Sequence, residues 1–249
     1  MKQAIDNFSG DPSGYAAYRP AYPDSLFEFL YGHTAHFDVA WDCGTGNGQV
    51  AAVLADRFAT VYGTDVSNDQ LQFAAKKENI IYRNERSEQS TLATSSVDLI
   101  TVAQAIHWFD FDAYYKEVRR VAKPGALFAA WTYNLLNISP AIDDIIHHFY
   151  FDIIYPYWDN ERRIVEDGYK RISFPFEEIQ APVFQINRKY NLKHLIGYLG
   201  TWSAVKHFKE TERKDPLQII EKELETAWGM AGERDVFWPV YMRAGRVVK

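Results

Sequence analysis

The chain has 249 residues, of which 47% are hydrophobic and 24% charged, and its formal net charge is −6. This length suits one sizeable domain with a lid, and the acidic balance disfavours a nucleic-acid partner, because phosphate binding needs clustered Lys and Arg. The single cysteine, Cys43, excludes an internal disulfide and a Cys-rich metal framework. No apolar stretch resembles a signal peptide or a membrane span, so we expect a cytoplasmic protein without a membrane partner.

Strands and helices alternate in residues 37–133. Short apolar runs typical of buried parallel strands stand at 39–43, 60–65, 79–84, 97–104 and 126–133. Helices are predicted between them at 48–59, at 67–77 with Ser67 as the cap, and at 111–123. The alternation predicts βαβ crossovers and a mostly parallel α/β sheet covered by helices on both faces.

The second half of the chain breaks this rhythm. We predict helices at 139–155 and 211–229, strands at 183–190 and 236–248, and an aromatic, charged connection at 156–175. Pro239 would place the last strand at an edge or bulge of the sheet, because proline cannot donate to a strand ladder.

A glycine-rich turn is the sharpest local signal. Glycines 44, 46 and 48 follow a predicted strand directly and precede a helix. Glycine at such a turn lets the backbone bend and approach a ligand closely. The spacing is G-x-G-x-G, with Gln49 where the dinucleotide fingerprint has its third glycine.

Two acidic residues accompany this turn. Asp65 ends the second predicted strand, 21 positions after Gly44, where a carboxylate can accept the ribose hydroxyls of an adenosine-bearing ligand. Asp42 precedes the first glycine by two residues. Asp65 alone does not separate NAD from S-adenosylmethionine (SAM), but Asp42 and the missing third glycine favour SAM.

Several segments resemble the motifs of class I SAM-dependent methyltransferases. They are residues 42–48, 63–71, 87–110 and 120–131. The chain is also similar to the trans-aconitate methyltransferase-like group. The Tyr-x-x-x-Arg-Pro-x-Tyr-Pro motif of that group stands at 15–23, its His-Trp-Phe at 107–109, and residues 201–205 resemble a further segment.

The resemblance implies a Rossmann-like, mostly parallel sheet of seven strands in a single domain of residues 1–249. Its parts would be an N-terminal lid and helix (1–36), the SAM-binding core (37–133), a helical insertion after the fifth strand (134–182), and C-terminal strands and helices (183–249). SAM would be the cofactor, S-adenosylhomocysteine the product, and no metal would take part.

Position by position, the resemblance implies a set of cofactor contacts. They are Tyr15, Arg19, Asp42, Gly44, Gly46, Asp65, Val66, Ser87, Glu88, Gln104 and Ala105. For Arg19 we expect contact with the methionine carboxylate of SAM, because an Arg fork can bind a carboxylate bidentately; the alternatives are the carboxylate of an acid substrate and a surface position. Asp65 would hold the ribose, and Val66, Ser87 and Glu88 would surround the adenine. Glu88 has a solvated loop position as an alternative.

The acceptor side is expected to be aromatic. His107 and Trp108 follow the fourth strand, where open α/β sheets place their ligands, and are the candidate catalytic residues. His107 is either a base for a hydroxyl acceptor or a hydrogen-bonded wall. Tyr18, Tyr22 and Trp202 are the candidate substrate contacts. For a carboxylate acceptor the available cations are Arg19, Arg188 and Lys206.

The expected function is methyl transfer to a small molecule, namely to a carboxylate oxygen of a trans-aconitate-like organic acid. A carboxylate needs no general base, because it is already ionised at neutral pH. Alternatives are C- or O-methylation of a phenol or quinone with His107 as base, a non-catalytic SAM-binding protein, and a nicotinamide-dependent oxidoreductase.

Overall fold

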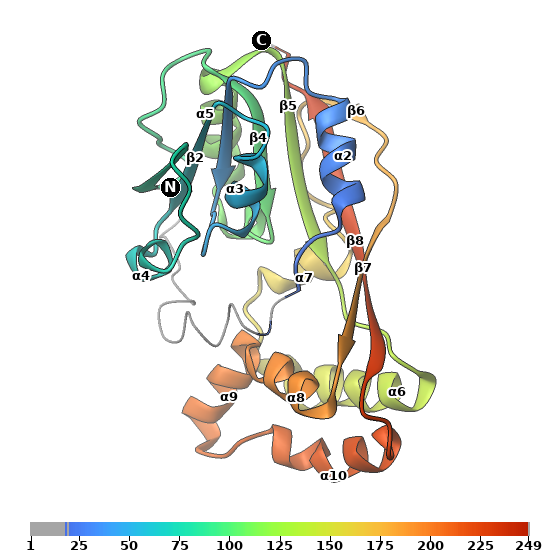
Figure 1. Ribbon diagram of the computed structural model, residues 1–249. Helices are drawn as coiled ribbons and strands as arrows, with labels where there is room; N and C mark the ends of the chain where they lie inside the picture. Colours follow the sequence, from blue (N-terminus) through green and yellow to red (C-terminus); the bar gives the residue numbers. More distant parts are fainter. Residues whose placement is uncertain (1–17, 19, 249) are drawn as a thin grey trace.

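The computed structural model describes residue 18 and residues 20–248 (Figure 1). Five parallel strands confirm the predicted core: β1 (Val39–Cys43), β2 (Thr60–Asp65), β3 (Ile80–Asn84), β4 (Val97–Ala103) and β5 (Ala122–Tyr133). The sheet order is β3-β2-β1-β4-β5-β8-β6, with β7 also paired to β8. The fold is therefore the Rossmann-like α/β fold that the sequence predicts.

The C-terminal strands differ from the prediction in number and place. Together with β6 (Glu177–Ile179), β7 (Phe184–Tyr190) and β8 (Arg234–Arg246), the sheet has eight strands instead of seven. β8 is antiparallel to β5, β6 and β7, and it lies inside the sheet, so the edge position predicted from Pro239 is wrong. The Pro239 carbonyl accepts from the N–H of Asn134, which lies just past the end of β5. The N–H that proline lacks would point to the same side. Pro239 is tolerated there because the β5 ladder has already ended.

Helices cover both faces of the sheet. α2 (Asp24–Gly32) and α3 (Gln49–Leu54) pack on one face, and α5 (Phe111–Val121) packs on the other. α4 (Asn68–Gln72) is shorter than predicted, but Ser67 caps it, accepting from the Gln70 N–H. The glycine turn and the ends of β2 and β4 therefore lie between packed helices.

A helical cap lies beyond the carboxyl ends of the parallel strands (Figure 1). It contains α6 (Pro140–His148), α8 (Leu192–Gly200), α9 (Ser203–Glu212) and α10 (Leu217–Trp228), while α7 (Arg162–Glu166) lies between the cap and the sheet. The single helix predicted at 211–229 is therefore two helices in the structure. Its first residues belong to the end of α9 and the rest forms α10, with a break near Pro216. A π-helical turn at Phe149–Ile153 and a 3-10 turn at Tyr155–Tyr157 follow α6.

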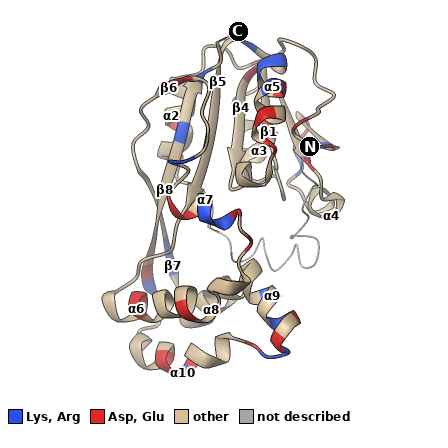
Figure 2. Cartoon of the chain, turned by 180° about the vertical axis from the view of Figure 1, so that it is seen from behind, with Lys and Arg blue, Asp and Glu red and all other residues tan. Residues whose placement is uncertain are grey.

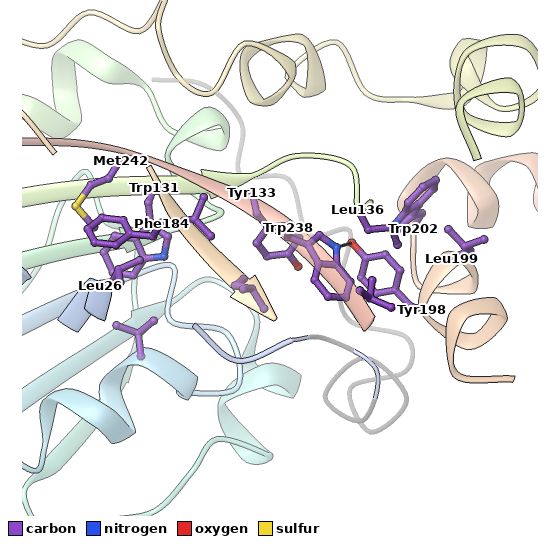
Figure 3. Packing of buried hydrophobic residues seen from close by; sticks show 14 of the residues in the cluster. Leu26, Trp131, Tyr133, Leu136, Phe184, Tyr198, Leu199, Trp202, Trp238 and Met242 are labelled. Carbon is purple, nitrogen blue, oxygen red and sulfur yellow. Dashed lines mark hydrogen bonds between the residues drawn. The ribbon is translucent and has the colours of Figure 1, made fainter. Parts of the chain in front are cut away.

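One hydrophobic core runs from the sheet into the cap (Figure 3). Trp131 of β5 and Trp238 of β8 are fully buried, and the Trp238 Nε1–H donates to the Tyr198 hydroxyl of α8 at 3.1 Å. Figure 2 shows Lys and Arg interspersed with Asp and Glu over the helices. Among the described residues, no helix is long and apolar enough to cross a bilayer.

Candidate active site

A cleft of about 1250 Å³, including its open mouth, lies at the carboxyl ends of β1, β2 and β4. The chain leaves β1 and β4 toward opposite sides of the sheet, and such a switch point is where open α/β sheets bind ligands. The lining includes every described candidate cofactor residue, namely Asp42, Gly44, Gly46, Asp65, Val66, Ser87, Glu88, Gln104 and Ala105. Tyr15 and Arg19 lie outside the described residues.

The glycines of the turn serve different purposes. All three have positive φ, with +63° at Gly44, +54° at Gly46 and +74° at Gly48. A Cβ on Gly44 would lie 2.6 Å from the Cβ of Ala105, so this glycine allows the turn to pack against the end of β4. A Cβ on Gly46 would meet no atom nearer than 3.9 Å and would project into the cleft. Gly46 therefore keeps space open for a ligand.

Asp42 lies at the floor of the cleft and is 1% exposed. Its two carboxylate oxygens accept from the hydroxyls of Thr101 at 2.8 Å and Thr45 at 2.6 Å. Burial raises the pKa of Asp42 to about 6, and the two hydroxyl donors only partly offset the loss of solvation. A cationic group in the cleft would favour the ionised form.

Asp65 ties together two loops of the cleft. Its Oδ2 accepts from the Gly46 N–H at 2.8 Å, and its Oδ1 accepts from the Ser67 N–H at 2.9 Å. A carboxylate has about four lone-pair sites, so these bonds leave acceptor capacity for hydroxyls. Beside it, Val66 is 39% exposed and presents an apolar face to the cleft.

Glu88 is buried, so its alternative as a solvated loop acid is wrong. Its side chain is 5% exposed, and its Oε1 accepts from Arg86 and from the Asp110 N–H, both at 3.1 Å. These bonds fix the loop after β3 to the start of α5. Ser87 is also buried at the cleft.

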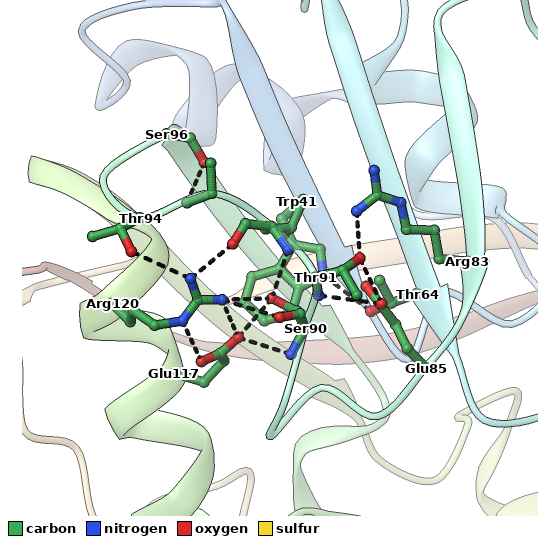
Figure 4. A network of polar contacts seen from close by, with 12 residues as sticks. Trp41, Thr64, Arg83, Glu85, Ser90, Thr91, Thr94, Ser96, Glu117 and Arg120 are labelled. Atoms are coloured by element: carbon green, nitrogen blue, oxygen red, sulfur yellow. Dashed lines mark hydrogen bonds and ion pairs between the residues drawn. The ribbon is translucent and has the colours of Figure 1, made fainter.

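A polar network anchors the next part of the same loop (Figure 4). Arg120 of α5 donates to both oxygens of Glu117 and to the carbonyls of Ser90 and Leu92. Glu117 in turn accepts from the Ser90 N–H at 2.8 Å. The segment that carries Ser87 and Glu88 is therefore held by α5.

Gln104 marks the end of β4 with a strained backbone. Its φ is +56°, which is uncommon for a residue with a Cβ, and its N–H donates to the Trp131 carbonyl at 2.9 Å. The 3-10 helix that follows the turn, Ile106–Trp108, brings Trp108 to the lining of the cleft. Strain at such a position is often retained for function.

A second cavity of about 580 Å³, including its open mouth, adjoins the cleft. The two share Gln104, Trp108 and Tyr133, and the second extends under the cap. Its other lining residues are His107, Trp158, Asp159, Arg162, Tyr198, Trp202 and Ser203. The molecule thus has a larger cleft at the glycine turn and a smaller aromatic cavity beyond it.

Comparison with known proteins assigns the family. A family model described as a methyltransferase domain matches residues 41–130. A Dictyostelium discoideum protein described as a methyltransferase is 34% identical over 245 residues, which cover 95% of this chain and 93% of the relative. The chain belongs to the class I SAM-dependent methyltransferases.

Two further similarities agree with this family. A methyltransferase structure from Anaeromyxobacter dehalogenans has a TM-score of 0.86 and 39% identity, covering 93% of this chain and 99% of the other. A Saccharomyces cerevisiae protein described as a SAM-dependent methyltransferase is 30% identical over 53% of this chain and 48% of its own. The protein is an enzyme with SAM as its cofactor, as the sequence predicts.

The larger cleft of this methyltransferase fits SAM. The open position at Gly46 admits a ligand against the turn, and the buried carboxylate of Asp42 suits the cationic methionine end. Asp65 and Val66 lie together at the end of β2, as a ribose and an adenine require. When bound, SAM supplies a methyl group on a sulfonium sulfur.

The residues expected to contact the methyl acceptor are divided between the two cavities and the core. His107 and Trp202 line the second cavity, Trp108 lines both, and Tyr22 lines the cofactor cleft. Tyr18 lines neither, because its ring packs against Gly197 of α8 and edge-on to His194, 5.1 Å away.

Of the candidate cations, neither Arg188 nor Lys206 lines either of these two cavities. Arg188 is exposed and donates to the Ala21 carbonyl. Among the described residues, the cation that lines the second cavity is Arg162, which was missed because it falls in a segment predicted as a connection. An aromatic residue four positions before it, Trp158, is the one local signal.

Proposed function

We propose that this methyltransferase methylates a carboxylate oxygen of a small organic acid that binds in the second cavity. The observation that carries the proposal is the guanidinium of Arg162, the one Lys or Arg among the described residues that line this cavity. Figure 2 shows its helix, α7, between the sheet and the cap. An acid bound there would lie beside the cofactor cleft.

Arg162 is oriented by its neighbours. Its guanidinium lies 4.8 Å from the ring centre of Trp158 and 5.8 Å from that of Tyr150, and its Nε donates to the Tyr150 hydroxyl at 3.1 Å. Among the described residues, its two terminal nitrogens have no hydrogen-bond acceptor. A stacked Arg with donors to spare suits bidentate binding of a carboxylate.

The remaining walls suit alignment and exclusion of water. Trp108, Trp158 and Trp202 line the cavity. Asp159, the other charged residue in its described lining, accepts from the Ser203 hydroxyl at 3.5 Å. In the transfer, the acceptor oxygen forms a C–O bond to the methyl carbon as the C–S bond breaks. The electron pair of the broken C–S bond stays on sulfur. An ionised carboxylate loses no proton, so the protein mainly positions the two reactants.

The trans-aconitate-like resemblance supports the same acceptor class. Both segments that carry it within the described chain, 107–109 and 201–205, contribute to the second cavity through His107, Trp108, Trp202 and Ser203. The alternative acceptor, a phenol or quinone-type molecule, is favoured by the presence of His107, which could take a hydroxyl proton.

An acceptor panel tests the proposal. Purified enzyme with labelled SAM would be offered small mono-, di- and tricarboxylic acids, phenols and hydroquinones. We expect methyl esters from acids, and a rise in KM of roughly 10- to 100-fold in Arg162→Gln, because a hydrogen bond to a charged group contributes about 1.5–3 kcal/mol.

Arg163→Gln is the matched control. Arg163 is the exposed neighbour on α7 and lines neither cavity, so the KM for an acid should stay at the wild-type value. Methylation of phenols alone, or an equal effect of both substitutions, would overturn the acid assignment.

A further inference from the structure

Two charged residues of α7, one helical turn apart, are joined through a tyrosine that follows α6. Arg162 begins α7 and Glu166 ends it, and the Tyr150 hydroxyl lies 3.1 Å from Nε of Arg162 and 2.9 Å from Oε1 of Glu166. Tyr150 is 1% exposed and belongs to the π-helical turn Phe149–Ile153. The three side chains form a row with the buried Tyr150 hydroxyl at its centre.

The chemistry of the two end groups fixes the direction of both hydrogen bonds. A guanidinium can only donate, so Nε–H of Arg162 donates to the Tyr150 oxygen. Burial raises the pKa of the Tyr150 phenol to about 12, so the phenol keeps its proton at neutral pH and donates it to the Glu166 carboxylate. Both directions follow without assigning a histidine tautomer or an amide orientation.

The row leaves one edge of the guanidinium for a ligand. A guanidinium can hold a carboxylate side-on, through Nε and one terminal nitrogen, or end-on, through both terminal nitrogens. Nε carries a single proton, and Tyr150 accepts it. The ring of Trp158, whose centre lies 4.8 Å from the guanidinium carbon, further limits how the group can turn. The end-on edge therefore remains on a residue that lines the second cavity.

We propose that Tyr150 and Glu166 are positioning residues that keep the end-on edge of Arg162 available to the second cavity, where both terminal nitrogens bind the carboxylate of the acid. The ligand in this proposal rests on the proposed function, whereas the row does not. Glu166 holds the Tyr150 proton away from the guanidinium, which has no acceptor for it. π-helical turns are rare and occur frequently at functional sites, which agrees with a functional role for Tyr150.

End-on binding is compatible with methyl transfer. A carboxylate that accepts one N–H on each oxygen still has an unshared electron pair on each, so one oxygen can attack the methyl carbon. The ester that forms carries no negative charge, and hydrogen bonds to neutral acceptors are weaker than those to a carboxylate. The hold of Arg162 on the product is therefore weaker than its hold on the acid, which favours release.

Nitrogen-15 NMR of the arginine side chains tests the row without any acceptor molecule. The protein would be labelled on arginine at slightly acidic pH, and Arg162→Gln and Arg163→Gln assign the two signals by their loss. We expect Nε–H of Arg162 to exchange with water several-fold more slowly than that of Arg163, the exposed neighbour on α7, because the buried Tyr150 accepts it. Equal exchange at the two arginines would overturn the proposal.

Matched variants show which groups protect this proton. Tyr150→Phe should raise the exchange rate of Arg162 Nε–H to that of an exposed arginine. Tyr157→Phe, which removes a phenol that donates to a glutamate of α9 instead, should leave the rate unchanged. Glu166→Gln keeps an acceptor oxygen for Tyr150 and should retain the protection, whereas Glu166→Leu, which leaves Tyr150 in place, should reduce it. Wild-type protection in both Tyr150→Phe and Glu166→Leu would overturn the proposal.

Titration with benzoate and with trans-aconitate tests which edge binds a carboxylate. The labelled protein would be saturated with S-adenosylhomocysteine, which has no methyl group to transfer. A bound carboxylate should shift the signals of the terminal N–H groups of Arg162 and leave its Nε–H signal in place. A shift at Nε–H, or no shift at Arg162 with either acid, would overturn end-on binding.

A double-variant cycle separates positioning from a merely structural role. With an acid that the acceptor panel shows to be methylated, Tyr150→Phe should lower kcat/KM several-fold. It should have no further effect in the Arg162→Gln background, because Tyr150 acts through Arg162. Equal losses in the two backgrounds would overturn the proposal. A panel that yields no ester would overturn the proposed function instead, while slow exchange at Nε–H would still demonstrate the row.

Discussion

The carboxylate of Asp65 accepts a hydrogen bond from the backbone N–H of Gly46 at 2.8 Å, which joins the end of β2 to the glycine turn after β1. The residue that the sequence assigns to the ribose therefore also shapes the turn beside it. Its second oxygen accepts from the Ser67 N–H, so two strand ends depend on one side chain.

Replacing Asp65 by Ala should weaken SAM binding and lower the stability of the free protein together. We expect a loss of about 1.5–3 kcal/mol in binding and of about 1–3 kcal/mol in unfolding free energy, because ligand hydroxyls and two backbone donors lose a charged acceptor. Calorimetric titration and denaturant unfolding measure the two losses. Asp56→Ala, at an exposed acid that forms an ion pair with Lys77, should change neither. Unchanged SAM affinity in a folded Asp65→Ala protein would contradict the ribose assignment.

Gly46 and Gly125 offer a matched pair of glycines for testing the open space in the cleft. Both have positive φ, +54° and +76°, and a Cβ on either would clash with no atom of the described residues, but only Gly46 lines the cleft. Gly46→Ala and Gly125→Ala should each cost about 1–2 kcal/mol of stability from the left-handed backbone. Only Gly46→Ala should also abolish SAM binding, as measured by titration. Equal SAM affinity in the two variants would show that Gly46 serves the backbone alone.

Arg120 should control the loop that carries Ser87 and Glu88. Arg120→Lys keeps the charge but loses the fork that binds Glu117 and the carbonyls of Ser90 and Leu92 at once. We expect faster amide exchange at Ser90 and several-fold weaker SAM binding. Arg119→Lys, whose guanidinium instead donates to the Pro175 carbonyl, is the control. Unaltered exchange at Ser90 would mean that Glu117 alone anchors the loop.

The parallel core and the cofactor cleft were predictable because their signals are local. Buried strands such as β4 are mostly apolar, the glycine turn follows a strand directly in the sequence, and Asp65 ends one. β6 was not predictable, since its three residues include two exposed glutamates and its pairing is set by β8.

The acceptor side depends on contacts between distant segments. Arg162 reaches a cavity that Gln104 and Trp108 also line, and Tyr169 comes within 2.9 Å of Nδ1 of His107, only when residues 156–175 pack against the end of β4. Within this segment the one local signal of this arrangement is Trp158. Glu88 shows the same limit, because its burial depends on Asp110, 22 positions later. For Tyr18 the sequence predicted a substrate contact that the structure does not show. Tyr18 belongs to a recognisable motif, but its ring packs on α8.

The buried Asp42 should couple SAM binding to proton release. Burial raises its pKa to about 6 in the free protein, with a smaller contribution from the negative charge of Asp65. A SAM molecule whose cationic methionine end lies near Asp42 would stabilise the carboxylate and lower this pKa. Binding at about pH 5 should therefore release up to one proton, and SAM affinity should rise as the pH increases through about 6. Above about pH 7 Asp42 is already ionised and its proton release should vanish.

Titration calorimetry in buffers of different ionisation enthalpy measures this release directly. Asp42→Asn keeps a group of the same size that can still bond to Thr45 and Thr101, but it cannot titrate, so its binding should release fewer protons at low pH than the wild type does. The variant should also bind SAM more weakly above about pH 7, where the wild type has the full charge. Identical proton release in the two proteins would show that Asp42 stays in one protonation state, and the methionine end would then have to be placed elsewhere in the cleft.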